Sequence, residues 1–302
     1  MDTRPITPAR LAASVIAVPP LARDAQRRVN REQNQRLVRH IEAGGVNTLL
    51  YGGNANFYHL RPSEYAATLE LLAEIAGPET LVVPSAGPAY GLSLDQAEIL
   101  RELPFPSTMV LPNTGLHTMA GVQTGLRHFA EVYGKPIVLY IKAEGYITPA
   151  GAAELVRDGL ISWIKYAIVQ PDPASDPFLA ELVQKVDPAL IVSGIGEQPA
   201  IVHLRDFGIN GFTSGCVCVN PRHSAALLQA IKRGDFTEAE RLREIYRPLE
   251  DLRNRINPIR VLHEAVALAG IAETGEVLPL LSPITAAEQA EVEAAARALK
   301  AA

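Results

Sequence analysis

Short apolar runs alternate with longer amphipathic segments along most of the chain. The apolar runs hold four to seven residues, as buried strands do, whereas the segments between them have the apolar spacing of helices. The predicted strands are residues 12–18, 48–51, 80–83, 107–111, 136–140, 161–165, 190–193 and 211–214. The predicted helices are residues 32–43, 62–76, 94–102, 121–133, 149–157, 177–186, 198–206 and 221–232. Eight βα units in about 230 residues predict an α/β fold, a parallel (β/α)8 TIM barrel.

The pattern changes after residue 233, where charged sequence rich in alanine and leucine contains no further predicted strand. We therefore predict two domains. Residues 1–233 form the barrel, with an active site at the C-terminal ends of its strands. Residues 234–302 form a C-terminal helical subdomain of about three helices, packed beside the barrel.

Capping residues and prolines mark several of the expected helix starts. Serine and threonine satisfy free backbone N–H groups at a helix start, and proline suits the first helical turn. The expected starts are at Ser63, Ser93 and Thr148 in the barrel, and at Thr237 with Glu240 (a capping box), Asn257-Pro258 and Ser282-Pro283 after it.

Composition narrows the range of partners. The chain of 302 residues is 48% hydrophobic and 20% charged, which is typical of a globular protein. The formal net charge of -5 comes without a basic stripe, so we expect no nucleic-acid partner. The polar N-terminus and the lack of an apolar run of about 18 residues predict a cytoplasmic protein without a membrane partner. A small molecule is the expected partner.

The metal-ligating residue types are sparse. Cys216 and Cys218, the only cysteines, would face the same side of a strand, where they suit a buried apolar pair better than a tetrahedral zinc site. The seven histidines include no His-x-x-x-His pair. We therefore predict no metal site.

Lys165 ends an apolar predicted strand, at the edge where a barrel carries its functional groups. Burial lowers the pKa of a lysine, and the neutral amine can form a Schiff base with a carbonyl compound. Alternatively, the side chain reaches solvent or pairs with a carboxylate. Tyr140 ends the preceding strand, so its phenol is expected beside the amine and can transfer protons, although its hydroxyl can equally lie in solvent.

The loops after the second and seventh predicted strands contain glycines. Gly52-Gly53-Asn54 offers backbone N–H groups that can bind a carboxylate, although glycines here can also simply form the turn. The stretch lacks the Gly-x-Gly-x-x-Gly spacing of a dinucleotide site. Gly194-Ile195 follows the seventh strand and lies at the same predicted edge.

Several of these segments together resemble the dihydrodipicolinate synthase and N-acetylneuraminate lyase family, the pyruvate-type class I aldolases. The resemblance implies that Tyr140 is the catalytic tyrosine and Lys165 the Schiff-base lysine. It also implies a C-terminal subdomain of three helices, a homo-oligomer (tetramer or dimer) and no metal or bound cofactor. The similar segments are residues 135–140, 161–165, 192–194 and 208–221.

The chain also departs from the family pattern. Gly52-Gly53-Asn54-Ala55-Asn56 stands where the family usually has Gly-Thr-Thr-Gly-Glu, so the threonine that relays protons is missing. Ile141-Lys142-Ala143-Glu144 replaces the usual Asn and Pro after Tyr140, and no arginine for aspartate semialdehyde follows. The tyrosine expected near Asn113-Thr114 is also absent. These departures argue against dihydrodipicolinate synthesis.

The sequence therefore predicts a lyase that forms a Lys165 imine with pyruvate or another 2-keto acid. The reaction is either aldol cleavage or condensation, or dehydration of a 2-keto-3-deoxy sugar acid. The alternative is a family member with little turnover that binds keto acids as a regulatory protein. The expected roles are proton transfer for Tyr140, substrate binding for Gly52, Gly53, Asn54, Gly194 and Ile195, and recognition of distal groups for Asn113, His117, Lys142 and Glu144.

Overall fold

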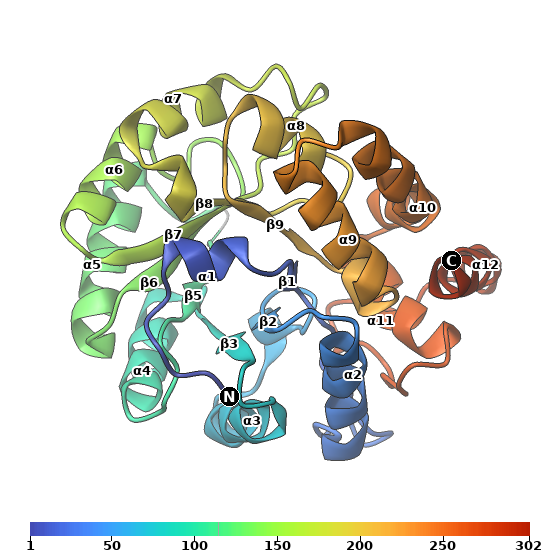
Figure 1. The fold of residues 1–302 in the computed structure, drawn as a ribbon. Coiled ribbons are helices and arrows are strands. Elements are labelled where there is room, and N and C mark those ends of the chain that lie inside the picture. Colours follow the sequence, from blue (N-terminus) through green and yellow to red (C-terminus); the bar gives the residue numbers. More distant parts are fainter. Residues whose placement is uncertain (114) are drawn as a thin grey trace.

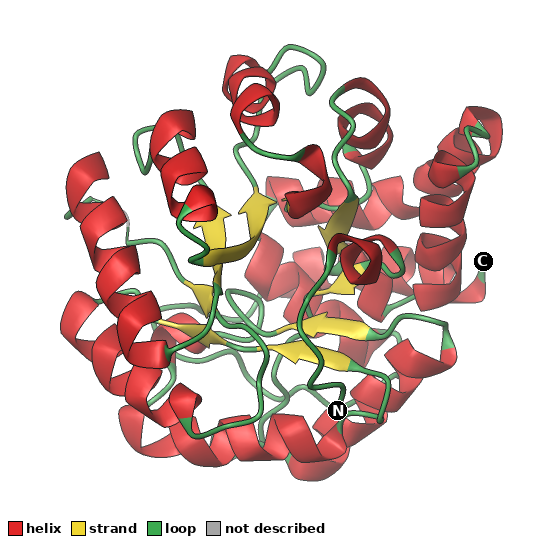
Figure 2. Cartoon of the chain, turned by 60° about the vertical axis from the view of Figure 1, so that its left-hand side comes forward, coloured by secondary structure: helices red, strands yellow, loops and turns green. Residues whose placement is uncertain are grey.

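The computed structural model, which describes residues 1–113 and 115–302, has a ring of parallel strands surrounded by helices (Figures 1 and 2). The strands are β1 Ile16–Ala17, β2 Thr48–Leu50, β3 Leu81–Val83, β4 Ser85–Ala86, β5 Met109–Val110, β6 Ile137–Ile141, β7 Ile161–Tyr166, β8 Ile191–Ser193 and β9 Gly211–Ser214. The barrel helices are α1 Pro8–Ala12, α2 Arg31–Ala43, α3 Pro62–Ile75, α4 Tyr90–Arg101, α5 Met119–Tyr133, α6 Pro149–Arg157, α7 Pro177–Lys185, α8 Ala200–Asp206 and α9 Pro221–Lys232. The C-terminal helices are α10 Phe236–Arg255, α11 Pro258–Leu268 and α12 Ala286–Ala301.

The predicted (β/α)8 barrel is confirmed. Strand order is β3-β2-β1-β9-β8-β7-β6-β5-β4, and β3 and β4 are separated only by Pro84. Proline has no N–H to donate, which interrupts the ladder at that residue. The Pro84 carbonyl still accepts a bond of 2.8 Å from the Met109 amide of β5. On either side of Pro84, β3 pairs with β2 and β4 pairs with β5. The two segments act as one barrel strand and close the ring.

The strands are buried on both faces because helices cover the outside of the ring. Every residue of β2, β3, β8 and β9 is buried, as expected for a parallel sheet whose strands have little polar alternation. Trp163 of β7 is fully buried and is among the largest buried side chains. The apolar runs in the sequence therefore reflect the burial of these strands on both faces of the sheet.

Two predicted strand features are wrong. The first strand is only Ile16–Ala17 instead of residues 12–18, because Thr7 caps a short helix, α1, with Pro8 in its first turn. Cys216 and Cys218 lie in a 3-10 helix instead of a strand. The Ser214 hydroxyl accepts a bond from the Val217 amide at 3.0 Å, and this local turn ends β9.

The capping predictions gave mixed results in the barrel. Thr148 caps α6 as predicted, accepting a bond of 3.0 Å from the Gly151 amide. Ser63 and Ser93 do not start helices, because α3 already begins at Pro62 and α4 at Tyr90. The Ser93 hydroxyl instead donates to the Tyr90 carbonyl within the first turn of the helix.

Among the C-terminal helices, only the Asn257-Pro258 start is confirmed. The predicted capping box of Thr237 and Glu240 is wrong, because Asp235 lies earlier and accepts the bond from the Glu238 amide at 3.1 Å. The last helix begins after Thr285, which forms a capping box with Glu288, and not at Ser282-Pro283. The predicted number of about three C-terminal helices is correct.

The C-terminal helices pack beside α9, on one side of the barrel (Figure 1). The buried Tyr246 hydroxyl of α10 donates to the Asn220 carbonyl, and the Asn220 side chain donates to the Leu299 carbonyl of α12 at 2.8 Å. Asn220 therefore links the barrel to two C-terminal helices. The division into domains at residues 233 and 234 stays a prediction.

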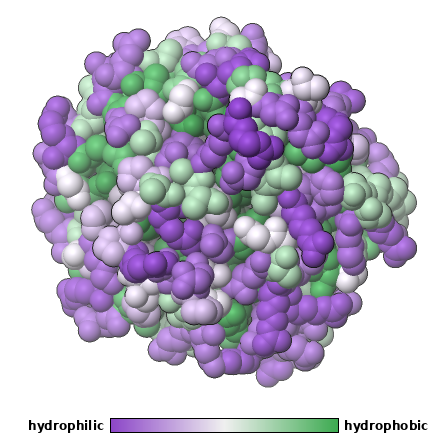
Figure 3. Space-filling model, in the orientation of Figure 1, coloured by the Kyte–Doolittle hydropathy of each residue, from purple (hydrophilic) through white to green (hydrophobic). Residues whose placement is uncertain are grey.

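The visible face in Figure 3 carries mostly hydrophilic side chains, with apolar groups in scattered small patches. None of the helices in the described part of the chain is both long enough and apolar enough for a membrane crossing.

Asn220→Ala should lower the free energy of unfolding by about 2 kcal/mol, from loss of a helix cap and of one buried hydrogen bond. Asn257→Ala is the matched control, because Asn257 also caps a helix that begins with proline but has only its cap bonds. Its expected loss is about 1 kcal/mol. Urea unfolding of both variants measures the difference, and equal losses would contradict the linking role of Asn220.

Candidate active site

Lys165 and Tyr140 lie side by side at the barrel mouth. Their strands, β7 and β6, are paired in a register that places the two residues opposite one another. The Lys165 Nζ is 4.4 Å from the centroid of the Tyr140 ring. The sequence-based expectation that a phenol accompanies the amine thus agrees with the geometry.

The Lys165 amine is buried without a counter-charge. Lys165 is 6% exposed, and among the described residues its side chain has no ion pair and no hydrogen bond. Burial lowers the pKa of Lys165 to about 7, and the positive charges of Lys142 and Arg253 contribute. The amine is therefore substantially neutral near pH 7, which is the nucleophilic form. The two structural alternatives for Lys165, solvation of the ammonium or pairing with a carboxylate, do not describe this site.

Tyr140 stays protonated over the same pH range. Burial raises the pKa of its phenol, Tyr58 raises it further, and Arg253 acts in the opposite direction. A protonated phenol can both donate and accept a hydrogen bond. Tyr140 can therefore pass protons to and from a group bound at Lys165.

The Gly52-Gly53-Asn54 turn presents backbone N–H groups beside this pair. The Gly53 and Asn54 amides have no hydrogen-bond partner within the described chain. Gly52, also predicted to bind substrate, is not among the residues that line the cavity with Lys165; a Cβ there would come within 2.7 Å of the Met109 methyl group. The Asn54 side chain donates to the Val18 carbonyl at 2.9 Å. This side-chain hydrogen bond supports the turn. The backbone N–H groups of Gly53 and Asn54 remain available to an anion.

The loop after β8 passes very close to Lys165. A Cβ on Gly194 would lie 3.0 Å from the Lys165 Cε and 2.9 Å from the Tyr166 carbonyl oxygen. A Cβ on Gly196 would lie 2.7 Å from the Arg253 Nη1. Only glycine fits at these contacts, and the loop therefore lines the space between the amine and the guanidinium.

A cavity of about 670 Å³ brings these groups together. Several of its lining residues come from α10 and α11 and were not expected from the sequence, because nothing local distinguishes them from other helix residues. The predicted residues that line it are Gly53, Asn54, Tyr140, Lys142, Lys165, Gly194 and Ile195, and the unexpected ones include Tyr58, Thr213, Arg243, Arg247, Arg253 and Ile259.

Three predicted specificity residues lie elsewhere. Asn113 and His117 line a second cavity of about 720 Å³, between α4 and α5. Glu144 is exposed and accepts a bond of 3.3 Å from the Gln170 side chain. Only Lys142 of the four candidates lines the cavity that contains Lys165. Thr114, named with Asn113 in the comparison with the family pattern, lies outside the described residues.

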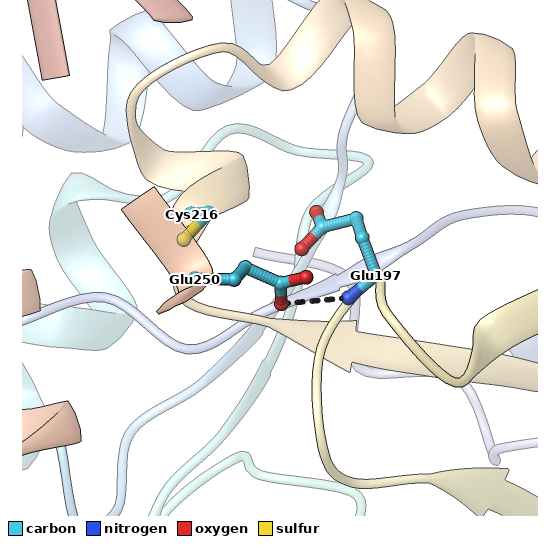
Figure 4. A group of neighbouring side chains, drawn as sticks. All are labelled: Glu197, Cys216 and Glu250. Carbon is cyan, nitrogen blue, oxygen red and sulfur yellow. Dashed lines mark hydrogen bonds between the residues drawn. The ribbon is translucent and has the colours of Figure 1, made fainter. Parts of the chain in front are cut away.

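Glu197 and Glu250 form a buried acid pair (Figure 4). Glu197 and Glu250 are both 0% exposed and approach one another beside Cys216. Burial raises the pKa of each carboxyl group, and the charge of Glu197 raises that of Glu250 further. Two neighbouring buried carboxylates disfavour joint ionisation, so the pair keeps a proton to higher pH than isolated glutamates do.

Protein donors already satisfy most of this cluster. The Glu197 oxygens accept bonds of 2.7 Å from the Ser214 and Ser224 hydroxyls. Oε1 of Glu250 accepts from the Glu197 amide at 2.9 Å and from Arg253 at 3.1 Å. Glu250 Oε2 is the one carboxyl oxygen of the two glutamates without a hydrogen-bond partner in the described structure. The three side chains are close enough to ligate a metal, but their hydrogen bonds describe a structural acid pair.

Comparison with known proteins agrees with this architecture. The model of the Dihydrodipicolinate synthetase family matches residues 12–301. The probable 5-dehydro-4-deoxyglucarate dehydratase 1 of Streptomyces coelicolor is 25% identical over 260 residues, which cover 81% of this chain and 79% of that protein.

Solved structures of low sequence identity share the fold. Dihydrodipicolinate synthase from Oceanobacillus iheyensis has a TM-score of 0.83 at 21% identity, with 98% of both chains covered. YagE from E. coli K12, solved in complex with pyruvate, has a TM-score of 0.82 at 19% identity, with 95% of this chain and 98% of that chain covered. Since the family model spans nearly the whole sequence, this protein belongs to the Dihydrodipicolinate synthetase family and is a lyase.

Proposed function

We propose that this lyase forms a Schiff base between Lys165 and a 2-keto acid. The observation that carries the proposal is a buried amine with a pKa lowered to about 7, 4.4 Å from the ring of Tyr140. An ordinary surface lysine is protonated at neutral pH and is a poor nucleophile. Burial in this cavity supplies the neutral amine that imine formation requires.

The reaction begins when the neutral Lys165 amine attacks the C2 carbonyl carbon of the substrate. The carbonyl oxygen takes up a proton to give a carbinolamine, which then loses water to form the protonated imine. Tyr140 donates and removes these protons. The free Gly53 and Asn54 amides bind the C1 carboxylate beside the imine.

The imine then withdraws electrons from C3. Loss of a C3 proton gives an enamine, and the C4 hydroxyl group then takes up a proton and leaves as water when the C–O bond breaks. In the alternative reaction, the C4 hydroxyl group of the imine loses its proton and the C3–C4 bond breaks, which releases an aldehyde and leaves the enamine on Lys165. We favour dehydration of a 2-keto-3-deoxy sugar acid, because the Streptomyces coelicolor relative is named as a sugar acid dehydratase. The loop after Tyr140 contains Lys142 and no arginine, which argues against dihydrodipicolinate synthesis.

The non-catalytic alternative, a keto-acid binding protein, was motivated by the missing threonine pair. Asn54 stands at the position of the second threonine, and its side chain donates a hydrogen bond to the Val18 carbonyl, which supports the turn. No contact in the described structure favours a purely regulatory role. A cytoplasmic location and assembly as a homotetramer or dimer stay predictions.

Borohydride reduction in the presence of pyruvate should attach one pyruvate residue to Lys165, identified by peptide mass spectrometry. Lys165→Arg should abolish the adduct, because arginine remains protonated. Lys185→Arg, at an exposed position on α7, is the matched control and should leave the adduct unchanged. Failure to trap an adduct on Lys165 would rule out the Schiff-base mechanism.

The initial rate of adduct formation should rise with pH through a midpoint near 7, because deprotonation of Lys165 creates the nucleophile. Below that midpoint the ammonium predominates and the rate falls. Trapping at a series of pH values measures the profile. A midpoint near about 10.4, the value of an ordinary lysine, would show that burial does not activate the amine.

Tyr140→Phe should slow pyruvate adduct formation by about 10²-fold or more, because the phenol that transfers protons is lost. Tyr90→Phe is the control, since Tyr90 is an exposed residue of α4 outside the Lys165 cavity. Rapid-quench trapping gives both rates. An unchanged rate in Tyr140→Phe would remove Tyr140 from the proton-transfer steps.

A further inference from the structure

The Lys165 cavity is lined by positively charged side chains from two sides. Lys142 comes from the loop after β6, and Arg243, Arg247 and Arg253 come from α10. No aspartate or glutamate is among the described residues that line it. A cavity with this lining, in a chain of formal net charge -5, favours a ligand with more than one negative group.

Arg253 is the cation best placed to contact such a ligand. Its side chain is 14% exposed, and only Nη1 is engaged, by Glu250 Oε1 at 3.1 Å. The other N–H groups of the guanidinium have no partner in the part of the chain that the structure describes. Glu250 is fully buried, so it orients the guanidinium while the unpaired donors remain available to the cavity. This arrangement suits bidentate binding of a carboxylate.

The other positively charged side chains that line the cavity differ from Arg253 in their ion pairs and their exposure. Arg243 and Arg247 form ion pairs with Glu240 and Glu244 on the same helix, which offset part of their charge. Lys142 is exposed and forms no ion pair with any described residue. Its Nζ lies 6.0 Å from the centroid of the Tyr58 ring. Lys142 can therefore add to the field that Arg253 creates.

The loop after β8 passes close to both Lys165 and Arg253. Gly194 approaches the Lys165 side chain and Gly196 approaches the Arg253 guanidinium, as their close contacts show. Both side chains line the same cavity, and the positive charge of Arg253 contributes to the lowered pKa of Lys165. One ligand can therefore contact the amine and the guanidinium at the same time.

We propose that the substrate is a 2-keto acid with a second carboxylate at the far end of its chain, and that Arg253 binds this carboxylate. The inference rests on the proposed function, since Lys165 would hold the keto carbon. The Gly53 and Asn54 amides bind the first carboxylate, and Lys142 strengthens binding of the second. A substrate that ends in a hydroxymethyl group leaves the donors of Arg253 without a charged partner and binds less tightly.

Two keto acids of equal chain length test the proposal directly. 2-Oxoglutarate carries the second carboxylate, and 2-oxopentanoate has a methyl group in its place. Borohydride trapping at Lys165 over a range of concentrations gives the half-saturating concentration of each. The wild-type protein should prefer 2-oxoglutarate by at least about tenfold. Equal half-saturating concentrations in the wild type would overturn the proposal without any variant.

Arg253→Gln should reduce this preference to less than about twofold. Arg255→Gln is the matched control: Arg255 belongs to the same helix, pairs with Glu291 at the surface and does not line the cavity. It should keep the wild-type preference. A preference that persists in Arg253→Gln would show that another group binds the second carboxylate, and would overturn the assignment of Arg253.

A measurement without a keto group separates the two proposals. Calorimetric titration compares glutarate with pentanoate, neither of which can form an imine. Tighter binding of glutarate by the wild type supports the distal carboxylate site even if no adduct forms on Lys165, in which case only the Schiff-base proposal fails. Equal binding, together with equal trapping of the two keto acids, overturns the distal site while the Schiff-base proposal stands.

Discussion

The burial of the Lys165 amine without a carboxylate partner is the constraint on which the rest of the site depends. An isolated buried charge is strongly unfavourable, so the amine gives up its proton near neutral pH. A carboxylate in contact with it would restore the ammonium and remove the nucleophile. The lining of the cavity agrees with this requirement, because its charged members among the described residues are all cations.

The acidic groups nearest the cavity are kept apart from it in a separate hydrogen-bonded cluster. The raised pKa values of the Glu197 and Glu250 carboxyl groups limit the negative charge close to Arg253. The cluster also joins α10 to the barrel, because Glu250 belongs to that helix and Glu197 to the barrel loop. The connection between α10 and the barrel and the orientation of the Arg253 guanidinium therefore both depend on the contacts of Glu250.

The barrel and the C-terminal helices contribute differently to the site. Strand pairing positions Lys165 and Tyr140, and such pairing is common to the fold that this chain shares with its relatives. The cations at the far side of the cavity come mainly from α10. Chemistry at the imine and recognition of the far end of the substrate can therefore change separately, which suits a fold that supports many substrates.

Local pattern in the sequence was sufficient for the barrel and for the pair Lys165 and Tyr140, because strand periodicity and chain order determine which residues end neighbouring strands. Helix starts were less certain, since several capping residues compete within a few positions, as Asp235 and Thr237 do. Only the tertiary structure decided that Arg253 lines the cavity, that Glu197 meets Glu250, and that Asn113 and His117 line another cavity. These contacts join segments distant in the chain, and no local spacing encodes which of many charged helix residues faces inward.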